Sequence, residues 1–194
     1  TNSGQATDAV LRVMFVCTGN TCRSPMAETL FRKLVTEKLD CRDWELRERG
    51  IDVFSAGIAA GGSDPATREA VQIMRESGLD LSQHHSRQVS RELMAQYDLI
   101  LVMEKGQKEA LQIEYPEANK KIFILTELTK GPVYDIPDPN REAEETCLEI
   151  AKEIKIKTER LLNSLDCKVS VTLFRKRFLS IGGCLSMESK YINN

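Results

Sequence analysis

The segment that most restricts the fold lies near the beginning of the chain, where a short apolar run passes through a tight loop into a helical pattern. Residues 10–16 (VLRVMFV) are apolar and β-branched and are followed by Thr-Gly-Asn, which predicts a buried strand and then a turn. A helix is expected next, because Ser24 can cap it, Pro25 suits its first position and apolar residues recur at helical spacing to Leu34. The chain therefore begins with a strand, a loop and a helix.

The same alternation continues to residue 165. Short apolar runs predict further strands at residues 51–55, 99–103 and 121–125. Helical patterns cover residues 63–79, which open with Ser63-Asp64-Pro65, and residues 90–95, 105–113 and 142–162. Strands that alternate with helices are typical of a parallel sheet, and 194 residues suit one domain of this kind. We expect a single α/β domain with a four-stranded parallel sheet flanked by helices.

The two ends of the chain differ from this pattern. Residues 1–9 form a polar lead that lacks the apolar core of a secretory signal. Residues 166–194 contain the basic run Arg175-Lys176-Arg177 and do not continue the alternation, so they are expected to form a C-terminal extension. The domain itself is assigned to residues 10–165.

Composition narrows the class of protein. A net charge of −2 argues against a nucleic-acid partner, which would require clustered Lys and Arg. The apolar runs are too short to cross a membrane, so no membrane partner is expected. Six cysteines in 194 residues are too sparse for a disulfide scaffold and favour a reducing compartment, the cytoplasm. We expect a monomeric cytoplasmic protein.

Residues 16–25 (VCTGNTCRSP) carry the chemistry, because they place Cys17 and Arg23 on either side of a five-residue loop between strand and helix. Backbone N–H groups at a helix N-terminus form an anion site, to which Arg23 can add a bidentate grip on phosphate oxygens. A thiol beside a helix N-terminus and an arginine loses its proton readily, and a thiolate that faces a bound phosphate is a nucleophile. Ser24 is placed to donate to this thiolate or to the loop, and Asn20 tolerates a left-handed turn.

A buried and inert Cys17 is the alternative, but Arg23 and the flanking elements favour a catalytic loop. A nucleoside-triphosphate-binding P-loop is excluded, because no Gly-Lys-Ser/Thr ends the loop.

The Cys-x5-Arg-Ser loop resembles the signature of the low-molecular-weight protein tyrosine phosphatases, most closely their bacterial protein-arginine phosphatase branch. The similarity spans about residues 11–165 and includes landmarks in the family's order: Ser55-Ala56-Gly57, Asp64-Pro65, His85-Ser86-Arg87-Gln88 and Asp138-Pro139. The resemblance implies a four-stranded parallel sheet, neither metal nor other cofactor, a phosphorylated protein as substrate and a cysteinyl-phosphate intermediate on Cys17. The substrate's phosphate would then be held by Thr18, Gly19, Asn20, Thr21, Cys22, Arg23 and Ser24.

This mechanism requires an acid for the leaving group and then a base for water. By resemblance that residue is Asp138, and a carboxylate on a loop stiffened by proline can be held over a phosphate site. Asp135 is the rival candidate in the same loop. His85, also by resemblance, is expected to support the phosphate loop, with an exposed polar residue as the alternative.

Two positions bear on the substrate. Tyrosine-specific members usually carry a bulky aliphatic residue where this chain has Thr21, whereas the arginine phosphatases resemble it in having Thr. A smaller wall with a hydroxyl suits a polar guanidinium better than a phenol ring. Asn140 also replaces an aromatic residue common in the family. We therefore expect phosphoarginine as substrate, with phosphotyrosine as the alternative.

The remaining cysteines leave further hypotheses open. Cys22 lies five residues from Cys17 and is close enough to form a protective disulfide if Cys17 is oxidised, with a buried filler role as the alternative. Cys41, Cys147 and the later cysteines show no metal-binding spacing and are expected to be core or surface thiols.

Functions other than hydrolysis are disfavoured. An arsenate reductase of this fold needs further cysteines near mid-chain, and none lies between Cys41 and Cys147. A non-catalytic phosphocarrier needs neither Arg23 nor Asp138, and both are present. A phosphate-sensing protein without activity is a further alternative, although Cys17, Arg23 and Asp138 are all intact.

Overall fold

The computed structural model describes residues 10–139 and 144–165. The predicted polar lead, Asn140 and the predicted extension after residue 165 lie outside these ranges. The elements, in chain order, are β1 (Leu11–Cys17), α1 (Arg23–Leu39), η1 (Asp43–Glu45), β2 (Ile51–Gly57), α2 (Arg68–Glu76), α3 (Arg91–Gln96), β3 (Leu99–Val102), α4 (Lys105–Glu114), η2 (Pro116–Lys121), β4 (Ile122–Ile124), η3 (Leu125–Leu128) and α5 (Glu144–Leu165), where η denotes a 3₁₀-helix. In the ranges described, no helix is long and apolar enough to cross a bilayer.

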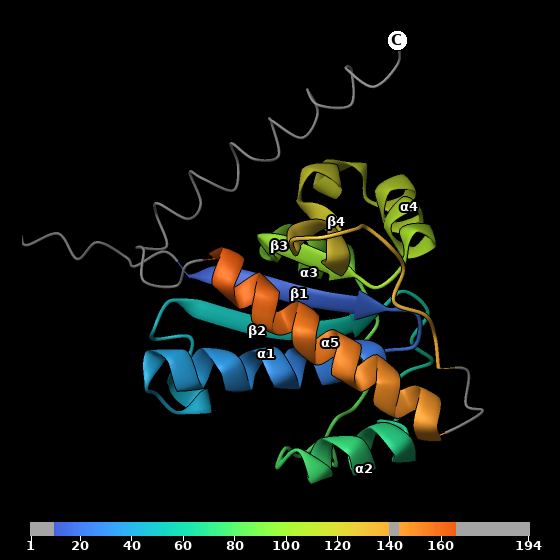
Figure 1. Cartoon of the computed structure of the whole chain (residues 1–194). Coiled ribbons are helices and arrows are strands. Elements are labelled where there is room, and N and C mark those ends of the chain that lie inside the picture. Colours follow the sequence, from blue (N-terminus) through green and yellow to red (C-terminus); the bar gives the residue numbers. More distant parts are fainter. Residues whose placement is uncertain (1–9, 140–143, 166–194) are drawn as a thin grey trace, which may run out of the picture.

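The predicted sheet is confirmed. Its four strands are parallel and lie in the order β2-β1-β3-β4. Helices α1, α2 and α5 lie on one side of the sheet, and α3 and α4 lie on the other (Figure 1). The sheet is thus covered on both faces, which explains why its strands are continuous apolar runs rather than alternating ones.

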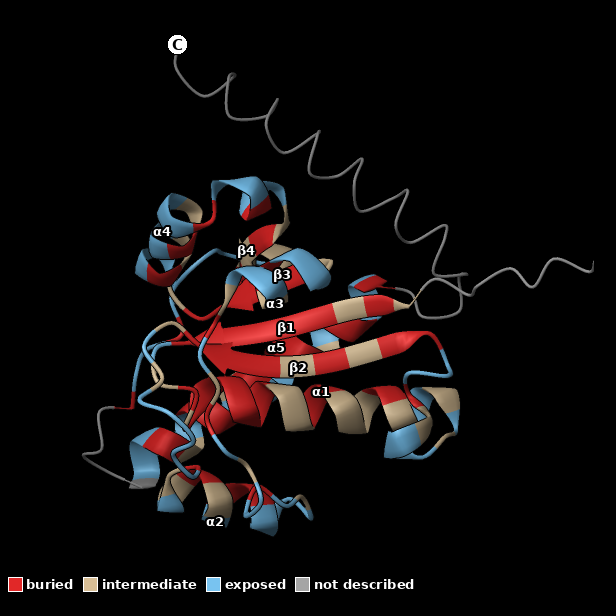
Figure 2. Ribbon diagram, turned by 180° about the vertical axis from the view of Figure 1, so that it is seen from behind, coloured by how far each residue is buried: buried red, intermediate tan, exposed pale blue. Residues whose placement is uncertain are grey.

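Strand β1 supplies side chains to both cores. Leu11, Val13 and Phe15 pack into the core with α1 and α5, whereas Met14 and Val16 pack into the core with α3 and α4. Figure 2 shows the strand buried along nearly its whole length. Because successive side chains point to opposite faces, Cys17 at the strand's end joins the α1–α5 core.

The strand order also fixes where a ligand can bind. The chain leaves β1 through α1 toward β2 on one side, and leaves β3 through α4 toward β4 on the other. The connections therefore diverge above the carboxyl ends of β1 and β3, and such a switch point is where open α/β sheets bind ligands. Cys17 ends one of these strands, and Glu104 follows the other by two residues.

Two predicted helix starts were wrong. Helix α1 begins at Arg23 with Cys22 as N-cap, so Ser24 is inside the first turn and its hydroxyl is used elsewhere. Helix α2 begins at Arg68, where the Thr67 hydroxyl accepts from the amide of the third helical residue, rather than at Ser63-Asp64-Pro65.

Residues 63–65 form a loop because they pair with a distant segment. Ser63 has a left-handed φ of 62°, and Pro65 forms an isolated bridge with His85. The Asp64 amide donates to the Ser86 hydroxyl at 2.9 Å, and the Ser86 amide donates to the Asp64 carbonyl at 2.7 Å. A helix over these residues would forfeit the pairing.

The end of β2 approaches the loop after β1 so closely that only glycine fits. A Cβ added to Gly57 would lie 2.7 Å from the carbonyl oxygen of Thr18 and 3.0 Å from Asn20. The Gly57 amide also donates to the Arg87 carbonyl at 2.8 Å. Since the neighbours include backbone atoms, the clash cannot be relieved by rotating a side chain.

We expect Gly57→Ala to lower the free energy of unfolding by about 1–3 kcal/mol, because the added methyl group displaces the loop. Gly106→Ala is the matched control, since nothing lies within 4 Å of its added Cβ and it lies within α4. That change should be neutral or stabilise by up to ~1 kcal/mol. Urea unfolding measures both, and equal stability of the two variants would contradict this account.

Candidate active site

The loop between β1 and α1 places the N-terminus of α1 at the point where the connections after β1 and β3 diverge. In the described structure no side chain caps the N-terminus of α1, and its first turn contains no acidic residue. The unsatisfied N–H groups and the positive end of the helix dipole therefore point at the loop. Such an N-terminus favours an anion, as the sequence predicts.

Asn20 shapes this loop. It adopts the predicted left-handed conformation, with φ 55°, and is fully buried. Its side-chain amide donates to the hydroxyls of Ser24 at 2.8 Å and Ser55 at 2.9 Å, and its side-chain oxygen accepts from the amide of Arg87 at 2.9 Å. Every polar atom of this buried side chain has a partner, so its position is well determined.

Cys17 lies at the base of the loop and receives hydrogen bonds. Its Sγ is 3.0 Å from the Ser24 hydroxyl oxygen and 3.3 Å from the Asn20 amide nitrogen. The Asn20 amide donates to the sulfur, whereas either the sulfur or the hydroxyl can be the donor in the contact with Ser24. Ser24 is therefore placed as the sequence analysis expected, although as part of the helix rather than as its cap.

The hydroxyl of Ser55 continues this network away from Cys17. It donates to Glu28 Oε2 at 2.6 Å, and the same carboxylate oxygen is 3.2 Å from a guanidinium nitrogen of Arg87. Burial raises the pKa of Glu28, while Ser55 and Arg87 oppose the rise. The hydrogen bonds that support the loop thus extend to a half-buried ion pair between Glu28 on α1 and Arg87.

Arg23 is buried beneath the mouth of the loop, with 2% of its side chain exposed. One terminal nitrogen pairs with Glu104 and donates to the Ile136 carbonyl at 2.9 Å, and the other lies 2.7 Å from Asp138 Oδ2. Burying a charged guanidinium costs free energy, and the two carboxylates offset this cost by pairing with it. The same fork faces the place where phosphate oxygens would lie.

The two aspartates of the 131–138 loop differ in position. Asp138 is at the mouth, paired with Arg23, and 49% of its side chain is exposed. Asp135 instead accepts a hydrogen bond at 2.7 Å from the amide of Lys105, the first residue of α4. Of these two aspartates, Asp138 is thus the one that pairs with Arg23.

The predicted substrate-binding residues fall into two groups. Thr18 is exposed and Gly19 and Thr21 are half-buried, so they line the opening, whereas Asn20, Cys22 and Ser24 are buried behind it. A Cβ added to Gly19 would lie 3.5 Å from the Thr21 hydroxyl, so this hydroxyl lies beside Gly19. Gln107 on α4 donates to the Thr18 hydroxyl at 3.2 Å and closes the loop from the other side.

The supporting histidine is His84 rather than the predicted His85. His84 Nε2 lies 2.7 Å from the carbonyl oxygen of Asn20, whereas His85 is exposed and contacts the carbonyl of Gln83. The Pro65–His85 bridge fixes the register of this segment and brings the neighbouring side chain to the loop. Adjacent side chains point in opposite directions, so sequence alone did not identify which one faces the loop.

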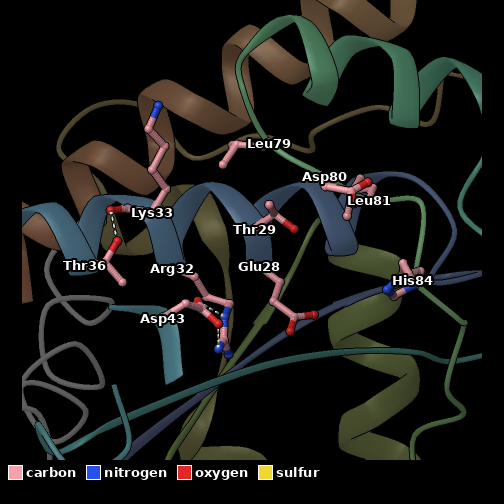
Figure 3. Close-up of a pocket in the computed structure, with 10 residues that line it drawn as sticks. All are labelled: Glu28, Thr29, Arg32, Lys33, Thr36, Asp43, Leu79, Asp80, Leu81 and His84. Atoms are coloured by element: carbon pink, nitrogen blue, oxygen red, sulfur yellow. Dashed lines mark hydrogen bonds and ion pairs between the residues drawn. The ribbon is translucent and has the colours of Figure 1, made fainter. Parts of the chain in front are cut away.

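His84 also borders a hollow of about 440 Å³ along α1. Figure 3 shows His84 at one end of it and Glu28 between His84 and the Arg32–Asp43 ion pair. No residue from Cys17 to Ser24 lines this hollow.

The sequence analysis missed Glu104, Gln107 and Glu28. Glu104 had a usable signal, since it follows a buried strand and polar residues after parallel strands gather at one edge of a sheet. Glu28 and Gln107 are helical positions that resemble any exposed polar residue. Within the described part of the chain, no group of three or more His, Cys, Asp or Glu side chains is arranged to hold a metal ion.

His84 yields a prediction on stability and pH. Burial lowers its pKa below the usual value, and the Asn20 carbonyl partly opposes this. The His84 imidazole is therefore protonated more readily in the unfolded chain than in the folded chain. The contribution of His84 to the free energy of unfolding is complete above about pH 6.5 and is lost as the pH falls. We expect urea unfolding of His84→Gln to show less destabilisation on acidification than the wild type.

His85→Gln is the control, and it should keep the pH dependence of the wild type because His85 is exposed. Identical pH dependence in all three proteins would refute the assignment of His84.

Comparison with known proteins agrees with this geometry. The family model described as low molecular weight phosphotyrosine protein phosphatase matches residues 12–171. A protein of Ralstonia nicotianae named probable low molecular weight protein-tyrosine-phosphatase EpsP is 37% identical over 130 residues, which cover 67% of this chain and 79% of the relative. The protein-arginine-phosphatase of Bacillus subtilis is 34% identical and covers 79% of this chain and 93% of its own length.

Solved structures agree as well. The YwlE arginine phosphatase from Geobacillus stearothermophilus superposes with a TM-score of 0.70 at 32% identity, covering 81% of this chain and 94% of its own. The fold, the loop from Cys17 to Ser24 and these matches lead to one conclusion: the chain belongs to the low-molecular-weight phosphotyrosine protein phosphatase family, whose members are phosphatase hydrolases.

Proposed function

We propose that this phosphatase removes phosphate from phosphoarginine side chains of proteins, through a cysteinyl-phosphate formed on Cys17. The observation that carries the choice of substrate is the wall of the loop, where the Thr21 hydroxyl lies beside Gly19. Glu104 and Asp138 add carboxylates at the mouth, partly exposed. Carboxylates and a hydroxyl are acceptors that suit the N–H groups of a planar guanidinium.

The first chemical step transfers the phosphoryl group to sulfur. The Cys17 thiolate attacks phosphorus, the phosphorus–nitrogen bond of phosphoarginine breaks, and Asp138 donates a proton to the departing nitrogen. Arg23 and the N–H groups at the start of α1 hold the phosphate oxygens. The Ser24 hydroxyl, 3.0 Å from Sγ, is positioned to donate a hydrogen bond to the sulfur in this step.

The second step restores the enzyme. Asp138, now a carboxylate, accepts a proton from water, the water oxygen attacks phosphorus, and the sulfur–phosphorus bond breaks to release inorganic phosphate and the Cys17 thiolate. Phosphotyrosine hydrolysis would follow the same steps with oxygen as the leaving atom. This phosphotyrosine hydrolysis is the second candidate function, and the similarity to the Ralstonia protein named as a tyrosine phosphatase favours it.

Thiol chemistry also bears on where the protein works. Six cysteines in 194 residues are too sparse for a disulfide scaffold, and on this ground we propose a reducing compartment such as the cytoplasm.

Specificity is tested with matched phosphoarginine and phosphotyrosine peptides. We expect a higher kcat/KM for phosphoarginine, and we expect Thr21→Ile to lower the ratio of the two values by roughly tenfold or more, because an aliphatic wall favours the phenol ring. Cys17→Ser is the blank and should abolish turnover of both peptides. A preference for phosphotyrosine in the wild type would assign the second candidate function.

The role of Asp138 is tested against Asp135. Asp138→Asn should lower kcat for phosphoarginine by about 10²-fold or more, because the leaving nitrogen requires a proton. The loss should be smaller for p-nitrophenyl phosphate, whose leaving group needs little protonation. Asp135→Asn is the control, since its contact is with Lys105, and it should retain most of kcat. Equal losses in both variants would remove the assignment of Asp138.

A further inference from the structure

The loop that carries Asp138 is irregular. Residues 131–138 follow η3, precede α5 and belong to neither a helix nor a strand. A general acid must lie within hydrogen-bond reach of the leaving atom, so a loop that carries one has to be held in place. The position of Asp138 therefore depends on individual contacts between this loop and its neighbours.

Thr126, in η3, supplies one of these contacts. It is fully buried, and its hydroxyl donates to the carbonyl of Tyr134 at 2.7 Å and accepts from the amide of the same residue at 3.2 Å. A single hydroxyl thus pairs with both backbone polar groups of Tyr134, as the backbone of a neighbouring strand would. The carbonyl of Thr126 accepts in turn from the amide of Thr129 at 3.3 Å and from its hydroxyl at 3.2 Å.

The side chain of Tyr134 is held by α5. Its hydroxyl donates to Glu153, and the Lys157 ammonium lies 4.7 Å from the centroid of its ring. Tyr134 is therefore fixed by Thr126 through its backbone and by α5 through its side chain. Because the contact with Thr126 is made by the backbone, it sets the course of the chain that follows.

The chain from Tyr134 to Asp138 is short and closely fitted. The Ile136 amide donates at 2.8 Å to the carbonyl of the residue that follows β3, and the Ile136 carbonyl accepts from Arg23 at 2.9 Å. Pro137 then restricts the backbone next to Asp138, whose carboxylate lies 2.7 Å from Arg23. A displacement of Tyr134 is thus passed along the chain to this carboxylate.

We propose that Thr126 is a positioning residue for the proposed reaction: its hydroxyl fixes Tyr134, and through it places Asp138 to protonate the leaving nitrogen. The proposal rests on the proposed function, in which Asp138 is the general acid. Without the hydroxyl, the amide and the carbonyl of Tyr134 face an apolar side chain. Backbone groups without a partner are costly, so the chain at Tyr134 moves to find other partners and Asp138 moves with it.

Two substitutions separate the hydroxyl from the packing of the side chain. Thr126→Val keeps the shape and removes the hydroxyl, whereas Thr126→Ser keeps the hydroxyl. We expect Thr126→Val to lower kcat/KM for a phosphoarginine peptide by about tenfold, because a misplaced acid protonates the leaving nitrogen less well. The loss should be less than about twofold for p-nitrophenyl phosphate, whose leaving group needs little protonation. Thr126→Ser should retain the wild-type ratio of the two values.

Thr158→Val is the matched control. Thr158 is also fully buried, and its hydroxyl donates to the Ile154 carbonyl within α5 at 2.9 Å. Its removal should leave the ratio of kcat/KM for the two substrates unchanged. Equal losses on both substrates in Thr126→Val, or the same fall of the ratio in Thr126→Ser, would mean a merely structural role and would overturn the proposal.

A double variant tests the route of the effect. If Thr126 acts through Asp138, Thr126→Val should lower kcat/KM for phosphoarginine no further once Asp138 is replaced in Asp138→Asn. A further loss of similar size in the double variant would contradict this route.

The position of the carboxylate is also measured without turnover. Crystal structures should show Asp138 beside Arg23 in the wild type and displaced from it in Thr126→Val. An unchanged contact in Thr126→Val would overturn the proposal, whatever the substrate. The expected displacement in a protein that turns over neither peptide would instead overturn the proposed function alone, so the two failures are distinguishable.

Discussion

The active site depends on the buried side chain of Asn20. Its amide group ties the phosphate loop to Ser24 on α1, to Ser55 on β2 and to the backbone at Arg87, while its own carbonyl faces His84. A buried polar group left without a partner costs about 1–3 kcal/mol, so all of these contacts must form together. The loop therefore adopts its shape only when the strand end, the helix start and the distant segment are in register.

Sheet topology then decides what faces the loop. With β1 and β3 adjacent, the chain that follows β3 turns away from α1 and places Glu104 opposite the helix start. Arg23 extends across this gap and pairs with Glu104, and the loop that ends in Asp138 closes over the same guanidinium. Residues far apart in the chain thus converge because the connections diverge at a single point of the sheet.

Much of this arrangement could be predicted from the sequence, because apolar runs and loop chemistry are local. The four strands and the left-handed Asn20 are of this kind. The start of α2 and the choice between His84 and His85 could not be predicted, since both depend on pairing between residues 63–65 and 84–86. A Ser-Asp-Pro sequence is equally compatible with the start of a helix and with a paired loop. Only the tertiary contacts of residues 63–65 decide between the two.

The pairing of Arg23 with two carboxylates links substrate binding to acid catalysis in the proposed mechanism. A guanidinium with 2% exposure requires counter-charge, and Asp138 supplies part of it. In this mechanism a bound phosphate offers the same guanidinium stronger, bidentate acceptors, so Asp138 is no longer needed as its counter-charge. Asp138 can then face the leaving group instead of Arg23, which is the position that the proposed proton donor requires. The arginine that binds the phosphate thereby also prepares the acid that completes the reaction.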